Sequence, residues 1–269
     1  MKRFVVAGQP VSHSRSPAMF AAAFHALGLS HRYDAALVDD AGFRGLVAEL
    51  EGGSLAGMNV TLPFKVRALE LAGRATVEAR RAGAANVLYV EQGVVVADNT
   101  DVPALASELD RLGASATAPA LVLGAGGAAR AAVIALLSRG ERTVVVRARD
   151  VARAQPLVAL SPSVTVESLE ARSTDKFQVV LQATSAGMLG GAPGDDVAEA
   201  VRWERLPRAA VAYDLVYVPA LTPFVARARR EGLVAESGLG MLVLQAALAF
   251  ERFVGRPAPV EVMRAALGL

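Results

Sequence analysis

Residues 120–150 follow the order strand, glycine-rich turn, helix and strand, and this order restricts the chain to a small number of folds. The segment "ALVLG" is typical of a buried strand, "AGGAARAAVIALLSRG" of a turn and a helix, and "RTVVVRARD" of a second strand. Two strands that are joined through a helix pair in parallel, because an antiparallel pair needs only a tight turn. The segment therefore predicts a βαβ unit and an α/β fold that contains a parallel sheet.

The rest of the chain also alternates between strand-like and helix-like segments, which favours α/β architecture throughout. Residues 84–99 are typical of a hairpin that turns at Gln92-Gly93. Residues 238–255 are apolar on most sides, so we expect a buried helix there. The pattern of strand-like and helix-like segments changes near Val102, which predicts a domain boundary at that residue. The other expected strands begin the segments 3–8, 31–38, 55–62, 177–187 and 209–217, and the other expected helices occupy 16–28, 41–53, 63–72 and 101–113.

Composition and charge exclude several classes of function. The chain has 269 residues with 53% hydrophobic content, which suits one large or two ordinary domains with a substantial core. Its net charge of +2, without a run of like charges, gives no support for a nucleic-acid partner. There is no cysteine, and the three histidines lack metal-ligand spacing, so we expect no disulfide and no metal site. No apolar stretch is long enough for a membrane span or a signal peptide, which predicts a cytoplasmic protein without a membrane partner.

The glycine turn fits the pattern G-x-G-x-x-A from Gly124 to Ala129. A strand precedes it and a helix follows it, so backbone amides and the positive helix end could hold a pyrophosphate. The second strand then ends at Arg147, Ala148 and Arg149, where an NAD-preferring site usually has an acid. Two guanidiniums there suit the 2′-phosphate of NADP. The alternatives are a tight turn without a ligand and two arginines that only face solvent.

Polar side chains gather in the first half of the chain. Ser12, Ser14 and Ser16 alternate just before a predicted helix, where they could bind a carboxylate, or Ser16 could only cap the helix. We expect His13 to face solvent. Asn59 and Thr61 share one side at the end of a strand, which is the edge where α/β sheets bind ligands. Further candidates are Asn86, Asn99 and Asp101. Together these groups suit a small polyhydroxylated acid, although each alone is more often a turn residue.

Lys65 stands out because the chain has 28 basic residues and only three are lysine. An ammonium can exchange its proton, whereas a guanidinium stays charged. A Lys-Asp pair formed by Lys65 and Asp101 could move a proton, with the carboxylate orienting the ammonium.

Eight motifs in one order resemble the shikimate dehydrogenase family, and the similarity runs from Phe4 to about Phe250. They are "GQPVSHSRSP", "GMNVTLPFK", "GAANVL", "DNTD", "LGAGGAARA", "ATSAGM", "YDLVY" and "GMLVLQAALAF". The resemblance implies NADP-dependent, reversible reduction of 3-dehydroshikimate to shikimate on the route to chorismate and aromatic amino acids. It also implies an α/β substrate domain at 1–102 plus 237–269, and a Rossmann-like NADP-binding domain with a parallel sheet at 103–236.

Residue roles follow from the same resemblance, matched motif by motif. Lys65 and Asp101 match the catalytic pair. The positions that match substrate contacts are Ser14, Ser16, Thr61, Asn86, Tyr217 and Gln245. The positions that match cofactor contacts are Gly124, Ala125, Gly126, Gly127, Ala128, Arg149, Leu215 and Gly238. We expect shikimate or 3-dehydroshikimate as the small-molecule partner, and a monomer or homodimer.

Four motifs depart from the family pattern. The usual Asn-Arg-Thr is Ala148-Arg149-Asp150, which removes polar groups and adds an anion near the expected phosphate. Val87, Val102 and Gln182 replace the usual Thr, Gly and Asn. Two alternatives stay open: a quinate- or aminoshikimate-type dehydrogenase with altered cofactor preference, and a non-catalytic nucleotide-binding sensor. The sensor would need the glycine turn but neither Lys65 nor Asp101.

Overall fold

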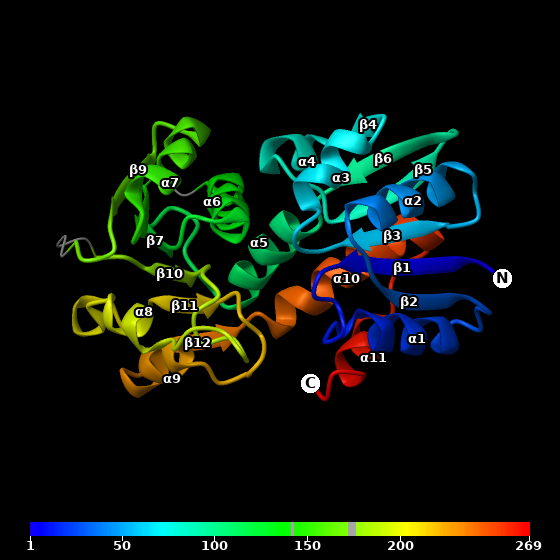
Figure 1. The fold of residues 1–269 in the computed structure, drawn as a ribbon. Helices are drawn as coiled ribbons and strands as arrows, with labels where there is room; N and C mark the ends of the chain where they lie inside the picture. The colour runs from blue at the N-terminus through cyan, green and yellow to red at the C-terminus, as the bar shows by residue number, and fades with distance from the viewer. Residues whose placement is uncertain (141–142, 172–175) are drawn as a thin grey trace. The chain divides into compact units, whose positions relative to one another are not determined.

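The computed structural model describes residues 1–140, 143–171 and 176–269. The chain divides into two compact units, 1–101 with 243–269, and 102–242 (Figure 1). Helix α5 (Asp101–Arg111) begins at the first division, and helix α10 (Leu239–Val254) contributes residues to both units. The chain therefore leaves the first unit once and returns to it through α10.

The first unit is built on a mixed six-stranded sheet with the order β2-β1-β3-β5-β6-β4. Strand β1 pairs in parallel with β2 and β3, whereas β5 pairs antiparallel with β3 and β6. The β5–β6 turn lies at Gln92 and Gly93, both with positive φ, which confirms the predicted hairpin. The strands are β1 (Arg3–Gly8), β2 (Arg32–Leu37), β3 (Gly57–Val60), β4 (Arg74–Ala75), β5 (Val87–Glu91) and β6 (Val94–Asp98).

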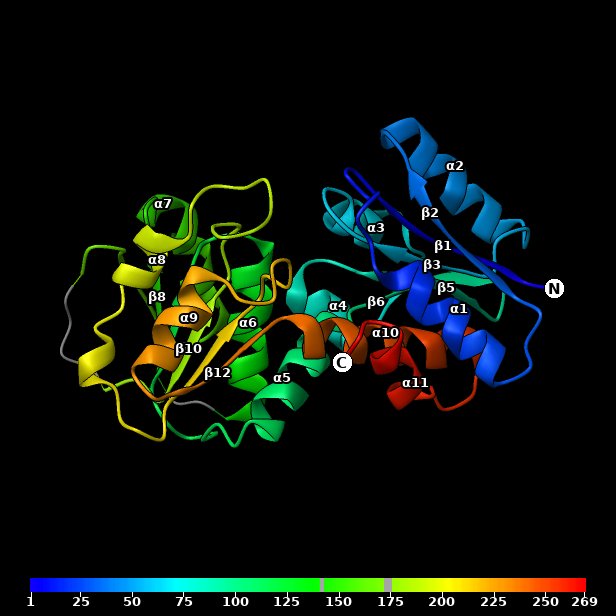
Figure 2. The same cartoon turned by 90° about the horizontal axis from the view of Figure 1, so that it is seen from below.

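Helices cover both faces of this sheet. On one face, Phe20 and Phe24 of α1 (Ser16–Ala26) and Phe4 of β1 pack against Phe250 and Phe253 of α10, with ring centroids 5.2–6.0 Å apart. Helix α11 (Val260–Ala265) lies beside α1 (Figures 1 and 2). A second apolar cluster on the sheet joins it to α2 (Asp40–Glu51), α3 (Lys65–Leu71) and α4 (Val77–Ala82). The C-terminal segment thus completes the core of the first unit.

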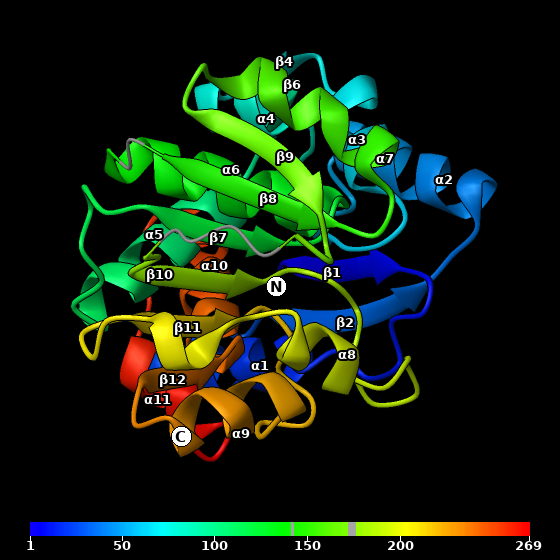
Figure 3. The same cartoon turned by 90° about the vertical axis from the view of Figure 1, so that its left-hand side faces the viewer.

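The second unit carries a fully parallel sheet with the order β9-β8-β7-β10-β11-β12 (Figure 3). This is the doubly wound dinucleotide-binding order, and its direction reverses between β7 and β10, where ligands of such sheets bind. The predicted βαβ unit is confirmed as β7, α6 and β8. The strands are β7 (Ala120–Leu123), β8 (Val144–Ala148), β9 (Val164–Ser168), β10 (Val179–Gln182), β11 (Val211–Asp214) and β12 (Val234–Ser237).

Helices cover this sheet as well. Helix α6 (Gly127–Arg139) packs against β7 and β8. A buried cluster that includes Trp203 and Phe224 joins the sheet to α8 (Asp195–Glu199), η2 (Trp203–Arg205) and α9 (Pro223–Arg230). Two short helices, α7 (Val151–Ala154) and η1 (Gln155–Leu160), connect β8 to β9. None of the helices in the described parts of the chain is long and apolar enough to cross a membrane.

Candidate active site

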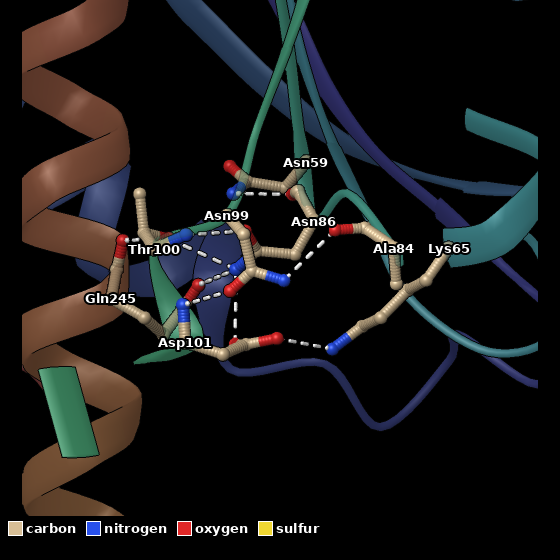
Figure 4. A network of polar contacts seen from close by, with 8 residues as sticks. All are labelled: Asn59, Lys65, Ala84, Asn86, Asn99, Thr100, Asp101 and Gln245. Carbon is tan, nitrogen blue, oxygen red and sulfur yellow. Dashed lines mark hydrogen bonds and ion pairs between the residues drawn. The ribbon is translucent and has the colours of Figure 1, made fainter. Parts of the chain in front are cut away.

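Lys65 and Asp101 form an ion pair in the first unit. Lys65 is the first residue of α3 and Asp101 is the first residue of α5. The Lys65 Nζ lies 2.7 Å from Asp101 Oδ2, and the two side chains are 30% and 12% exposed (Figure 4). The Lys65 backbone is fixed as well, since its carbonyl accepts a 2.8 Å hydrogen bond from Ala85 N–H. The ammonium is therefore held in place while part of it stays open to a ligand.

Asn86 lies at the centre of the polar network around this pair. Its Nδ2 lies 3.0 Å from Asp101 Oδ1, 2.9 Å from Thr100 Oγ1 and 3.4 Å from Gln245 Oε1. Its Oδ1 accepts a 2.8 Å hydrogen bond from Thr100 N–H. Asn86 is buried, so these contacts replace the water that its amide would otherwise bind. One oxygen of Asp101 is thereby held by Asn86, and the other faces Lys65.

The loop "DNTD" shapes the start of α5. Asn99 Oδ1 accepts from Asp101 N–H at 3.1 Å, and Asn99 Nδ2 donates to Ala84 O at 3.0 Å. Thr100 Oγ1 donates to the backbone carbonyl of Gln245 at 3.0 Å, which connects the loop to α10. The structure therefore brings together four of the expected residues, Lys65, Asp101, Asn86 and Gln245.

The serines lie at the start of α1. Ser14 Oγ accepts from Ser16 N–H at 3.3 Å, and Ser16 itself is buried. The N-cap position belongs to Arg15, and α1 has no side-chain cap hydrogen bond within the described residues. The alternative that Ser16 only caps the helix is therefore wrong, because Ser16 is the first residue of α1 and Arg15 is its N-cap.

Asn59 belongs to β3, and Thr61 follows that strand. The Thr61 N–H donates to Ala7 O at 2.9 Å. A Cβ at Gly8 would clash with Thr61 Cγ2 and would lie 2.9 Å from the backbone oxygen of Leu62, so glycine is required there. Asn59 Oδ1 accepts a 2.8 Å hydrogen bond from the Tyr33 hydroxyl, and Asn59 Nδ2 donates to Asn86 O at 3.4 Å. Asn59 was predicted from the sequence and Tyr33 was not, because a lone tyrosine on a strand is usually a core residue.

The glycine turn of the second unit connects β7 to α6. Gly124 has φ +126°, and a Cβ there would lie 3.0 Å from Ala183 O, so this position requires glycine. A Cβ at Gly126 or Gly127 would meet no atom of the described residues within 4 Å. Gly126 is the N-cap of α6 and has no side chain that could accept from the first amides of the helix. This open turn fits the pyrophosphate of a dinucleotide.

The two arginines at the end of β8 differ in environment. Arg147 is buried, its Nε lies 3.1 Å from Glu167 Oε2, and its guanidinium lies over the ring of Phe177. The interpretation that two guanidiniums face a 2′-phosphate is therefore wrong for Arg147. Arg149 is exposed. The Asp150 carboxylate caps α7 by accepting a 3.0 Å hydrogen bond from Arg153 N–H.

Leu215 and Gly238 meet at the carboxyl ends of β11 and β12. The Leu215 N–H donates to Gln182 O at 2.9 Å, and a Cβ at Gly238 would lie 2.6 Å from Leu215 O. The Gln182 side chain in turn donates to Ala186 O at 2.9 Å and also accepts from Thr184 N–H. The longer amide thus closes the turn where the family usually has asparagine. Tyr217 follows Leu215 in the same loop of the second unit.

Asp214 anchors that loop from the end of β11. Its Oδ2 accepts from Thr222 Oγ1 at 2.6 Å and its Oδ1 accepts from Val216 N–H at 2.9 Å. Burial raises the pKa of Asp214 from 3.8 to about 6, although both hydrogen bonds act in the opposite direction. Between these pKa values the folded state keeps a proton that the unfolded chain releases, so the free energy of unfolding contributed by Asp214 falls as pH rises.

We therefore expect Asp214→Asn to gain stability relative to the natural chain as pH rises. The asparagine cannot ionise, so the difference in unfolding free energy should shift in its favour by about 2–3 kcal/mol between pH of about 4 and about 7. Urea unfolding of both chains at these two pH values measures the shift. If the difference in unfolding free energy between the two chains stays constant with pH, the loss of stability at higher pH does not come from the Asp214 carboxylate.

Comparison with known proteins agrees with this arrangement. The family model for the shikimate dehydrogenase substrate binding domain matches residues 6–88, and the model for the shikimate 5′-dehydrogenase C-terminal domain matches residues 238–267. The NADP(+) shikimate dehydrogenase of Caulobacter vibrioides is 41% identical over 278 residues, which cover 98% of this chain and 94% of that protein.

Two solved structures are similar over almost the whole chain. Shikimate 5-dehydrogenase from Thermus thermophilus, in complex with NADP(H) and shikimate, is 36% identical with a TM-score of 0.86 and covers 99% of this chain and 98% of its own. The enzyme from Listeria monocytogenes, in complex with shikimate and NAD, is 26% identical with a TM-score of 0.91 and covers 99% and 96%. With a relative above 40% identity along nearly its full length, the chain belongs to the shikimate dehydrogenase family.

Proposed function

We propose that this protein is a shikimate dehydrogenase that reversibly reduces 3-dehydroshikimate to shikimate with NADPH, in the shikimate pathway to chorismate and aromatic amino acids. The observation that carries the proposal is the Lys65–Asp101 pair, held at 2.7 Å within the Asn86 network of a chain from this family. A proton donor beside amides and hydroxyls is what a hydroxylated cyclic acid needs. The relative from Thermus thermophilus was crystallised with both NADP(H) and shikimate.

The residues of the first unit take the substrate roles. Ser14 and Ser16 bind the carboxylate through their hydroxyls, at the start of α1. Thr61, Asn86 and Gln245 contact the ring hydroxyls, since amides and hydroxyls can both donate and accept there. Tyr217, in a loop of the second unit, stays a substrate contact predicted from the sequence. In this assignment 1–102 with 237–269 forms the substrate domain, and 103–236 forms the cofactor domain.

Proton transfer belongs to Lys65. When the ring ketone of 3-dehydroshikimate becomes an alkoxide, the Lys65 ammonium donates a proton to that oxygen, and in the reverse direction its amine takes the proton back. Asp101 Oδ2 keeps Nζ in position, and Asn86 holds Oδ1 of the same carboxylate. Because Asn86 also contacts Gln245, movement of the substrate ring and of the proton donor is restricted by one network.

The open glycine turn is where the second unit would hold NADP. Gly124, Ala125, Gly126, Gly127 and Ala128 would bind the pyrophosphate through their backbone, since α6 begins there without a side-chain cap from the described residues. Arg149 would contact the 2′-phosphate, and Leu215 with Gly238 would border the nicotinamide. When bound, NADPH supplies the hydride, and the protein contributes position and electrostatics. The cytoplasmic location and the state of the protein as a monomer or homodimer stay predictions from the sequence.

The test is the initial rate of cofactor reduction with shikimate or quinate, each paired with NADP or NAD. We expect fast turnover only with shikimate and NADP. Turnover with quinate or NAD would indicate a relative with shifted specificity, with Ala148 and Asp150 as the first residues to exchange. No turnover in any pairing, together with cofactor binding measured separately, would contradict the proposal and favour the nucleotide-binding sensor.

A further inference from the structure

Asp98, the last residue of β6, is a buried carboxylate that has no role in the proposed function. Its side chain is only 3% exposed, and both of its oxygens have partners. Oδ1 accepts from Thr76 Oγ1 at 2.7 Å and from Asn99 N–H at 2.8 Å. Oδ2 lies 2.9 Å from Nε of Arg252 on α10. A buried carboxylate is stable in one position when a cation and further donors satisfy its oxygens in this way.

Two routes lead from Asp98 to the carboxylate of Asp101. Through its side chain, Asp98 holds the Asn99 N–H, and Asn99 Oδ1 accepts from Asp101 N–H at 3.1 Å (Figure 4). Through its backbone, Asp98 O accepts from Asn86 N–H at 3.1 Å, and Asn86 Nδ2 donates to Asp101 Oδ1. The position of Asp98 therefore affects both the backbone and the side chain of the residue that holds Lys65.

We propose that Arg252 is a positioning residue for proton transfer, acting through Asp98 on the carboxylate of Asp101, and this inference rests on the proposed function. Without Arg252, Oδ2 of Asp98 loses its charged partner, which is costly for a buried carboxylate unless it moves toward water. Such a movement withdraws Oδ1 from the Asn99 N–H. The start of α5, and with it the Asp101 carboxylate, is then held less tightly beside Lys65.

Arg252 is a better residue to replace than Thr76, the other side chain that holds Asp98. Thr76 is the N-cap of α4, and its Oγ1 accepts from Ala79 N–H at 3.2 Å. A substitution there would also remove a helix cap and would mix two effects. The Arg252 side chain is 54% exposed, so its truncation leaves no cavity in the core. The effect of Arg252→Ala should therefore come from its contact with Asp98.

The experiment uses Arg252→Ala in the full chain, with initial rates measured at varied shikimate and saturating NADP. We expect kcat to fall about threefold to tenfold, as for the loss of one hydrogen bond, while KM for shikimate changes less than about twofold. Arg252→Lys should recover at least about half of the natural kcat, because the arginine meets the carboxylate through Nε and a lysine also supplies a charged donor. Arg256→Ala removes an exposed arginine from the segment after α10 and is the matched control, which should keep the natural kcat.

The same substitution in an Asp101→Ala background separates positioning from a general structural effect. Without the Asp101 carboxylate there is no group for Arg252 to position, so Arg252→Ala should lower the remaining kcat by less than about twofold. A general effect on the first unit would lower kcat by the same factor in both backgrounds. The thermal unfolding midpoint of each variant confirms that the rates are measured on folded protein.

The outcomes separate this inference from the proposed function. If the natural chain does not oxidise shikimate with NADP, the proposed function is wrong. If it does, an unchanged kcat in Arg252→Ala would overturn the positioning role, as would an equal fall in the Asp101→Ala background. A rise in KM without a fall in kcat would also overturn it, because Arg252 would then act on substrate binding. Failure of Arg252→Lys to recover kcat would contradict the assignment of the effect to a charged contact with Asp98.

Discussion

Replacement of Lys65 by alanine is expected to lower kcat by about 10²–10⁴, the usual contribution of general acid–base catalysis. The ammonium is the group that Asp101 holds at 2.7 Å, and methyl cannot supply its proton. The residues that we propose to bind the cofactor belong to the other unit, so the dissociation constant of NADPH should stay within about twofold of the natural value. Turnover with shikimate and NADP measures the first effect, and the fluorescence of bound NADPH measures the second.

Two further variants show whether charge or proton exchange matters at this position. Lys65→Arg keeps a positive charge beside Asp101 but cannot give up a proton, so its kcat should also fall by orders of magnitude. Lys176→Ala removes an exposed lysine of the second unit and should turn over like the natural chain. Full activity in Lys65→Ala would remove this residue from the mechanism, and full activity in Lys65→Arg would reduce its role to electrostatics.

The sequence predicted the fold well where a pattern is long and local. The βαβ unit of β7, α6 and β8 has a strand, a glycine turn and a helix in succession, and the β5–β6 hairpin has a turn at Gln92-Gly93. Strand β4 (Arg74–Ala75) has only two residues and α11 (Val260–Ala265) has six, so neither has enough periods to be recognised. Ser16 was expected as an N-cap, but the helix begins one residue earlier than a serine cap requires.

The sequence predicted which residues form the candidate site, but not how their side chains contact one another. Motifs identified Lys65 and Asp101, which are far apart in the sequence, and the structure places their side chains in contact. No motif could reveal that Arg147 pairs with Glu167, because this contact depends on the register between β8 and β9. Tyr33 was not predicted for the same reason, because its connection to the site is a hydrogen bond with Asn59 on another strand. Polar residues whose partners are distant in sequence need the folded chain to be understood.

Side-chain and backbone contacts also explain how α10 contributes to the site, although most residues of this helix are apolar. Its phenylalanines complete the core of the first unit, and Gln245 meets the site through its side chain and its backbone carbonyl. Arg252, further along α10, pairs at 2.9 Å with Asp98, which is the first residue of the "DNTD" loop. The polar contacts of this helix therefore act on the loop that holds the carboxylate beside Lys65.

Replacement of Arg149 by alanine is expected to weaken NADPH binding about tenfold to 100-fold, the range for losing a hydrogen bond between charged groups. Arg149 is the exposed arginine at the carboxyl end of β8, and sheets of this order bind a 2′-phosphate at that end. Arg147, in contrast, is buried against Glu167. NADH lacks that phosphate, so its dissociation constant should change less than about twofold. Titration of both reduced cofactors by fluorescence measures the two effects on one protein.

The control for this variant is Arg208→Ala, which removes the same charge from the same unit. Arg208 is exposed and precedes β11, at the amino-terminal edge of the sheet, whereas Arg149 follows β8 at the carboxyl edge. A long-range effect of net charge would weaken NADPH binding in both variants, and this effect would decrease with added salt. A direct contact with the phosphate weakens it only in Arg149→Ala. Equal losses of NADPH and NADH affinity in Arg149→Ala would show that this guanidinium does not recognise the 2′-phosphate, and cofactor choice would then depend on other residues around Asp150.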